Sequence, residues 1–145
     1  MKRAIGCCDL GEQVRNKGYV LLQYGRDSNS GSFCGLGPIL HIPAKEMKET
    51  GLALVLDKLR HCPEIDPLKL PSANKVANQE LLKIKRNHLI VAITLFEGDF
   101  LDITPLHGGR GWQFSSHEDE ANQLELPATN DEFLEILVKA FEVAS

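Results

Sequence analysis

Residues 89–104 read LIVAITLF-EGD-FLDIT, two β-rich runs joined by a short turn at 97–99. A glycine-containing turn between two such runs predicts a β-hairpin. The first run is apolar on both faces, which is typical of a central strand. The second alternates, with Leu101 and Ile103 on one face and Asp102 on the other, so it should bury only one face. The stretch therefore predicts the middle of a sheet.

Segments on either side of this hairpin add further strands. Short β-rich runs predict strands at 3–8, 19–24, 38–43, 112–115 and 123–126. Glycine and serine dominate residues 26–37, and this composition predicts a loop. Residues 62–78 contain three prolines and predict an irregular connection, followed by a short helical piece at 79–85.

Two segments have helical periodicity. Apolar residues recur at i, i+3, i+4 and i+7 in 44–61, which predicts an amphipathic helix that Pro63 ends and Gly51 weakens. Near the end of the chain, Thr129 and Glu132 have the spacing of a capping box, with a helical apolar stripe after them. A stripe of this kind normally packs against a core.

These elements predict an α+β fold, with an antiparallel or mixed sheet of about six strands and two main amphipathic helices. The chain of 145 residues is long enough for a core of its own. It contains no internal repeat and no dividing linker. We therefore expect a single domain over residues 1–145.

The composition is that of an ordinary globular protein, with 43% hydrophobic and 25% charged residues. No apolar run approaches the roughly 20 residues of a membrane-spanning helix, and the start of the chain lacks an export signal. A cytoplasmic location is expected. The four cysteines are then expected to be reduced thiols that act as small buried hydrophobes.

Charge is distributed unevenly along the chain. Residues 1–96 contain 14 basic and 9 acidic side chains, whereas residues 97–145 contain 2 basic and 11 acidic ones. A nucleic-acid-binding protein needs a basic surface, and the second half would repel phosphates. An acidic surface instead fits a cationic protein partner.

The acidic residues of the hairpin and of a later loop form the candidate docking patch. If their strands are neighbours, the charges converge on one edge of the sheet. Trp112, the single tryptophan, is either a core residue or an interface anchor. The candidate partner-binding residues are Glu97, Asp99, Asp102, Trp112, Glu118, Asp119 and Glu120.

Motifs for catalysis are weak. The Gly-rich stretch 31–37 lacks the lysine of a phosphate loop, and residues 107–110 (HGGR) have no G-x-S-x-G nucleophile elbow with them. Cysteines and histidines lack metal-ligand spacing, so no metal, cofactor or catalytic residue is predicted. One alternative remains open, a thiol enzyme or small hydrolase that uses Cys34 or Cys62 with a histidine.

Three pieces of the chain resemble the immunity proteins of bacterial contact-dependent growth inhibition systems, the CdiI family. The helix at 49–59 (ETGLALVLDKL), the hairpin at 89–93 and 101–105 (LIVAI and LDITP), and the capped helix at 126–141 are similar to the corresponding elements of that family. Together they cover roughly residues 44–145.

The resemblance implies a cytoplasmic protein that binds and blocks the C-terminal toxin domain of a delivered effector. Many such toxins are nucleases, some of them ribonucleases, so the expected partner is a basic nuclease and not a nucleic acid or a membrane. The family has no shared catalytic residues to carry over. A scaffold or adaptor with an unrelated partner is the third reading.

Overall fold

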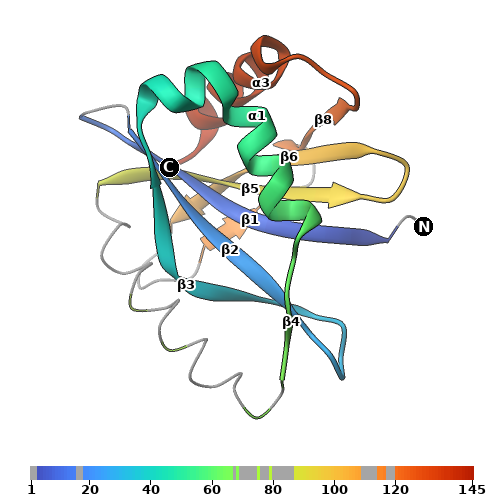
Figure 1. Ribbon diagram of the computed structural model, residues 1–145. Helices are drawn as coiled ribbons and strands as arrows, with labels where there is room; N and C mark the ends of the chain where they lie inside the picture. Colours follow the sequence, from blue (N-terminus) through green and yellow to red (C-terminus); the bar gives the residue numbers. More distant parts are fainter. Residues whose placement is uncertain are drawn as a thin grey trace.

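The computed structural model describes residues 3–15, 18–66, 68, 75, 79, 87–108, 114–116 and 120–145 (Figure 1). The expected helical piece at 79–85 lies, apart from its first residue, outside this described part.

The described part contains one sheet and two long helices. The strands are β1 (Ala4–Gln13), β2 (Tyr19–Asp27), β3 (Phe33–Ile42), β4 (Glu64–Ile65), β5 (His88–Phe96), β6 (Phe100–Gly108), β7 (Phe114–Ser116) and β8 (Asn122–Glu125). The helices are α1 (Ala44–Arg60) and α3 (Asn130–Val143). The strand order is β3-β2-β1-β5-β6-β7, while β4 pairs with β2 and β8 pairs with β6.

The predicted fold class is confirmed. The fold is α+β, and every strand pair is antiparallel except the short parallel pair of β4 and β2. The sheet has eight strands where about six were expected. The predicted hairpin is β5 and β6, and β5 lies centrally between β1 and β6.

The prediction of a loop over residues 26–37 is wrong at both ends, because only residues 28–32 form the connection. β2 continues to Asp27 and β3 already begins at Phe33, so these residues form the end of a second hairpin. Its turn is short because the Asp27 carboxylate accepts hydrogen bonds from Asn29 N–H and Ser30 Oγ, and because Gly31 adopts a positive φ of 74°. Gly35 and Gly37, which were expected to be loop residues, occupy strand positions in β3, whereas Gly31 lies in the turn.

Strand ends also differ from the expected ones. β1 and β3 are longer than the predicted runs at 3–8 and 38–43, because β1 pairs along its length with β5 and β3 pairs along its length with β2. β8 and β7 differ from the predicted runs at 123–126 and 112–115 by one or two residues at their ends. Pairing to neighbouring strands, which a single run of residues does not encode, extends or shifts each strand.

Both predicted helices are confirmed, and α1 has a kink at Thr50, where φ is −139° and ψ is 21°. The side-chain amide of Asn130, in α3, forms hydrogen bonds with the backbone of α1 on both sides of this kink. Its Oδ1 accepts the N–H of Leu52 at 2.8 Å, and its Nδ2 donates to the carbonyls of Met47 at 3.3 Å and Lys48 at 2.7 Å. A side chain inserted into the backbone ladder is a recognised cause of a helix kink.

The predicted capping box starts α3. The Glu132 N–H donates to Thr129 Oγ1 at 3.1 Å, and the Thr129 N–H donates to Glu132 Oε1 at 3.4 Å. Two backbone donors at the start of the helix are thereby satisfied.

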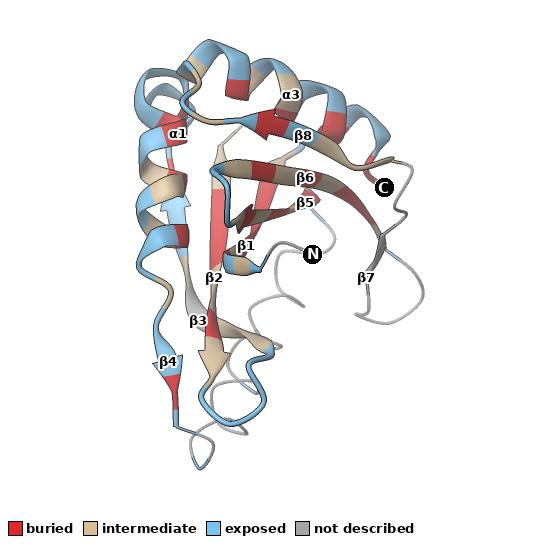
Figure 2. Cartoon of the chain, turned by 90° about the vertical axis from the view of Figure 1, so that its right-hand side faces the viewer, coloured by how far each residue is buried: buried red, intermediate tan, exposed pale blue. Residues whose placement is uncertain are grey.

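The main core lies between the helices and one face of the sheet (Figure 2). Leu10, Ile93 and Leu101 from the sheet meet Val55 of α1 and Phe133 of α3, all fully buried. A smaller buried cluster on the opposite sheet face contains Val20, Ile90 and Leu106. The central strands therefore bury both faces, which explains the unbroken apolar run of β5.

Candidate functional site

The tip of the β5–β6 hairpin carries two of the predicted acidic residues, and both are exposed. Glu97 and Asp99 flank Gly98, and Asp99 has a positive φ of 55°. Behind them, the rings of Phe96 and Phe100 stack with centroids 5.1 Å apart and planes at 12°. Both rings are half-buried, so the acidic tip is backed by partly accessible aromatic surface.

The third predicted carboxylate, Asp102, lies on the same sheet face as Phe100, two positions along β6. Its Oδ1 accepts a hydrogen bond from Thr104 Oγ1 at 2.8 Å. Across the strand pair, β8 places Gln123 opposite Asp102 and Glu125 opposite Phe100. Directly opposed residues share a face, so Glu125 joins this acidic group. We call Glu97, Asp99, Asp102 and Glu125, with Phe96 and Phe100, the acidic hairpin end.

A hollow of about 520 Å³ opens beside the hairpin turn. Asp99, Phe100, Gln123 and Glu125 line it, and the Leu126 N–H donates to the Asp99 carbonyl at 2.8 Å and so fixes its edge. Two carboxylates beside an aromatic ring suit a lysine or arginine side chain.

Glu97 lies in a different setting from the rest of this end. Its N–H donates to the Arg3 carbonyl at 2.8 Å, and it borders a hollow of about 260 Å³ together with Arg3, Arg26 and Glu64. The neighbouring guanidinium groups offset part of its charge. Asp99, Asp102 and Glu125 therefore contribute most of the local negative charge.

The structure separates Glu120 from the hairpin. Glu120 Oε2 lies 2.6 Å from His107 Nε2, near the opposite end of β6. Seven residue steps separate Phe100 from His107, which corresponds to about 23 Å along a strand. The expected convergence of the hairpin charges with the later acidic loop therefore does not hold for Glu120. The remaining predicted residues, Trp112, Glu118 and Asp119, lie outside the described residues.

His107 also contacts the last residue of the chain, and the three side chains form a Ser-His-Glu arrangement. Its Nδ1 lies 2.8 Å from Ser145 Oγ. A hydrolase would also need backbone donors for an oxyanion. However, the Gly108 N–H already donates to the Ser145 carbonyl, and the Ser145 N–H donates to the Leu106 carbonyl. These contacts fasten the chain after α3 to β6.

The thiols of the open enzyme alternative are described, and all four cysteines are free. Cys62 Sγ donates to the Tyr24 carbonyl at 3.2 Å. Burial raises the pKa of the Cys62 thiol, and the nearby Arg26 lowers it to a smaller extent. Burial also raises the pKa of Cys7 to about 12. A raised pKa leaves little of the Cys62 or Cys7 thiol as thiolate at neutral pH.

Asp9 is the buried acid that the sequence did not reveal. It lies in β1 with 7% of its surface exposed, and its Oδ2 accepts a hydrogen bond from Tyr24 Oη at 2.7 Å. Burial raises the pKa of Asp9 to about 6, while the Tyr24 hydrogen bond lowers it to a smaller extent. Its position between β2 and β5 makes it a structural acid of the sheet interior.

Among the described residues, no group of three or more histidine, cysteine or acidic side chains is arranged to hold a metal ion. Within the same part of the chain, no helix is both long and apolar enough to cross a membrane.

Comparison with known proteins identifies a similar fold. No family model and no curated protein matches the chain. A solved structure, the protein of unknown function NMB0488 from Neisseria meningitidis, is similar with a TM-score of 0.70. The match covers 99% of this chain and 98% of that one at 15% sequence identity. The likeness shows a shared fold. At this identity it carries no activity from one protein to the other.

Sequence reasoning missed Glu125 and the stacked pair Phe96–Phe100. Glu125 stands inside a predicted strand, but its place beside the hairpin depends on the register between β8 and β6. The two phenylalanines flank the predicted turn symmetrically. Residues in these positions face each other across a hairpin, so the sequence could have predicted their contact.

Proposed function

We propose that the protein is a cytoplasmic immunity protein that binds the C-terminal toxin domain of a contact-dependent growth inhibition effector and blocks it stoichiometrically. The observation that carries the proposal is the acidic hairpin end. Asp99, Asp102 and Glu125 come together there beside a partly accessible pair of phenylalanine rings. The resemblance of residues 44–145 to CdiI proteins and the acidic second half of the chain point in the same direction.

The physical basis is electrostatic complementarity. A nuclease concentrates lysine and arginine around the cleft that receives the phosphate backbone. An acidic protrusion enters such a cleft readily, because opposite charges speed the encounter. Aromatic side chains at the centre of an interface then slow dissociation. In this proposal the hairpin supplies both the charge and the aromatic surface. The carboxylates lie at its tip and the stacked pair Phe96–Phe100 lies behind them.

The first experiment is co-purification with the polypeptide encoded immediately upstream of this protein, followed by a nuclease assay with and without the protein. We expect a one-to-one complex and loss of nuclease activity at equimolar ratio. Activity that persists in the complex, or no complex at all, contradicts the proposal.

The second experiment locates the contact. In the double variant Asp99→Asn with Glu125→Gln, both carboxylates become neutral amides, and asparagine still tolerates a positive φ. We expect the affinity for the toxin domain to fall by about tenfold or more, mainly through slower association, and the effect to shrink at high salt.

The matched control is Glu46→Gln with Glu49→Gln, which neutralises two exposed carboxylates on α1. The control has the same net charge as the hairpin variant, so a general effect of charge would lower both affinities equally. Equal affinities of the two double variants, measured by calorimetry, would remove the hairpin end from the interface.

A further inference from the structure

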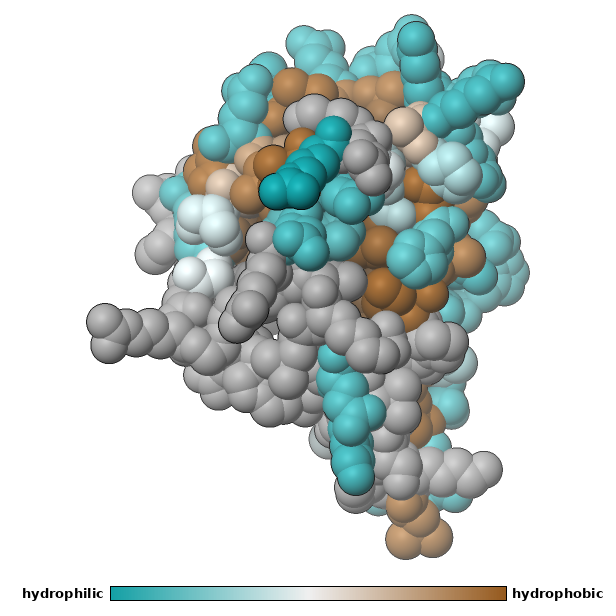
Figure 3. Space-filling view, turned by 90° about the vertical axis from the view of Figure 1, so that its left-hand side faces the viewer, coloured by the Kyte–Doolittle hydropathy of each residue, from teal (hydrophilic) through white to brown (hydrophobic). Residues whose placement is uncertain are grey.

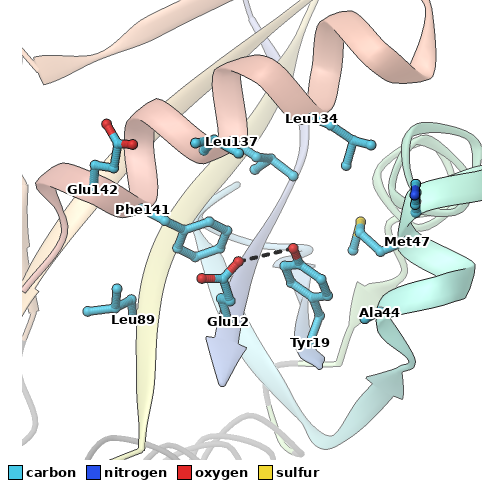
Figure 4. Close-up of a pocket in the computed structure, with 11 residues that line it drawn as sticks. Glu12, Tyr19, Ala44, Met47, Leu89, Leu134, Leu137, Phe141 and Glu142 are labelled. Carbon is cyan, nitrogen blue, oxygen red and sulfur yellow. Dashed lines mark hydrogen bonds between the residues drawn. The ribbon is translucent and has the colours of Figure 1, made fainter. Parts of the chain in front are cut away.

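A groove lies at the end of the sheet opposite the hairpin, between α1 and α3 (Figure 4). Its volume is about 560 Å³, and most of its lining is apolar. Leu134, Leu137 and Phe141 enter it from α3, Met47 from α1 and Leu89 from β5. Five elements contribute to one apolar hollow, because β1 and β2 supply its floor with Glu12 and Tyr19.

The floor of the groove is held by aromatic and polar contacts. Tyr19 Oη donates to Glu12 Oε2 at 3.1 Å, and the Tyr19 ring packs on Phe141 with centroids 6.2 Å apart. Burial, with the neighbouring Glu12 charge, raises the pKa of Tyr19 to about 12, so its hydroxyl remains a donor at neutral pH. These contacts hold the side chains at the floor of the groove in place.

Apolar surface remains accessible at this end of the molecule. Val138 lines the groove and is 56% exposed, and Val14 and Val143 are exposed at the same end of the sheet. Figure 3 faces this side and shows hydrophobic surface between hydrophilic side chains. Concave apolar surface with few polar groups is typical of a binding site.

The charges at the groove determine what it fits. Carboxylates of Glu12 and Glu142 border it beside Phe141, whereas Lys48 borders it on the α1 side (Figure 4). Negative charge continues along α3, whose exposed face carries Asp131, Glu132 and Glu135 against the single Lys139. A cationic group is therefore favoured next to an apolar one.

We propose that this groove is a second docking site, which receives an apolar side chain of a protein partner with a lysine or arginine next to it in the partner's sequence. The apolar side chain enters between Leu134, Val138 and Phe141, and the cation lies toward Glu142. The site is independent of the acidic hairpin end, because the two lie at opposite ends of the sheet. It therefore stands whether or not the hairpin binds a toxin domain.

The test uses three short synthetic peptides as probes and the isotope-labelled full chain. One has a central leucine flanked by lysines, the second replaces the lysines by glutamates, and the third replaces the leucine by serine. We expect the first to shift the NMR amide signals of Leu89, Leu134 and Phe141, and the other two to bind at least about tenfold more weakly.

Two exposed valines of α3 provide a matched pair of protein variants. Val138→Lys places a cation in the groove and should abolish binding of the first peptide. Val143→Lys makes the same change at a residue that is 46% exposed but does not line the groove, and should weaken binding no more than Glu142→Gln does. Glu142→Gln should weaken binding by about two- to fivefold, as for a partly screened charge pair.

Four outcomes would overturn the proposal. Equal effects of the two valine variants, or equal binding of the lysine and glutamate peptides, would show that neither the groove nor its charge selects the ligand. Self-association that Val138→Lys abolishes would assign the groove to a second copy of this chain. Signal shifts confined to the hairpin would assign peptide binding to the acidic end.

Discussion

The two ends of the sheet are built in different ways. The acidic hairpin end forms from one local element, since Glu97, Asp99 and Asp102 lie within six residues of one another and only Glu125 comes from elsewhere. The groove end draws on residues from 12 to 142, and no two neighbouring elements of the chain suffice to make it. A local site survives small changes in packing, whereas an assembled one depends on how the two helices meet.

This difference makes Asn130 the critical residue of the groove end. Its amide joins α3 to the kink of α1 through three hydrogen bonds and so sets the direction of the first turns of α1. The described hydrogen bonds of the Asn130 side chain all go to α1 and none to the β5–β6 hairpin. Changes at Asn130 should therefore disturb the groove and leave the hairpin end intact.

The largest effect is expected for Asn130→Ala. Removing the amide leaves one N–H and two carbonyls at the kink without this partner, and we expect a loss of about 3–4 kcal/mol of unfolding free energy. Urea denaturation measures it. The control Asn122→Ala removes an amide that makes one described bond, to the Glu120 carbonyl, and should cost about 1 kcal/mol. Similar losses in both variants would contradict the role of the Asn130 network.

Asp9→Asn tests the sheet between the two ends. The folded state holds the Asp9 proton more tightly than the unfolded chain, with a pKa of about 6 against 3.8. The folded state therefore binds more protons between these pH values, and stability falls as the pH rises through this window. Two pKa units correspond to about 3 kcal/mol.

The asparagine variant lacks this titration and can still accept the Tyr24 hydrogen bond. Its unfolding free energy should therefore rise relative to that of the wild type by about 2 kcal/mol between pH 4 and pH 7. Denaturation at several pH values gives the difference. Parallel pH profiles of the two proteins would show that the pKa of Asp9 is not raised. In this variant, the NMR amide signals of the acidic hairpin end and of the groove should not shift.

Thr129→Ala should have a smaller effect. It removes the hydroxyl that accepts the Glu132 N–H at the start of α3, and N-cap losses typically cost about 1 kcal/mol. Thermal unfolding measures the loss. Thr50→Ala serves as the control, because Thr50 Oγ1 makes only an exposed bond to the Glu46 carbonyl, and should change stability by less than about 0.5 kcal/mol. A larger loss at Thr50 than at Thr129 would contradict this ranking.

The smallest effect on stability is expected at the hairpin tip. Asp99 has a φ of 55°, which asparagine adopts easily and β-branched residues do not. Asp99→Asn should change the unfolding free energy by less than about 0.5 kcal/mol, whereas Asp99→Val should cost about 1–2 kcal/mol. Urea denaturation of both variants distinguishes them. Equal stability of the two would show that the tip relaxes without strain.

The sequence by itself determined the elements in which local pattern and local structure agree. The hairpin at 89–104 followed from its turn and its alternation, and the helix after Thr129 followed from its capping box. The kink of α1 at Thr50 lies next to Gly51, the residue that was expected to weaken this helix. In each case the deciding interactions join residues a few positions apart, so the pattern contains the information.

Tertiary structure decided the rest. The glycines of 26–37 read as a loop, yet pairing with β2 makes several of them strand residues. The register between β8 and β6 places Glu125 beside the hairpin, whereas Glu120 contacts His107. Asn130 contacts Met47, 83 positions away, and the groove depends on the contact of Tyr19 with Phe141, 122 positions apart. Such long-range contacts form only when distant segments pack together, and no local pattern in the chain specifies which ones meet.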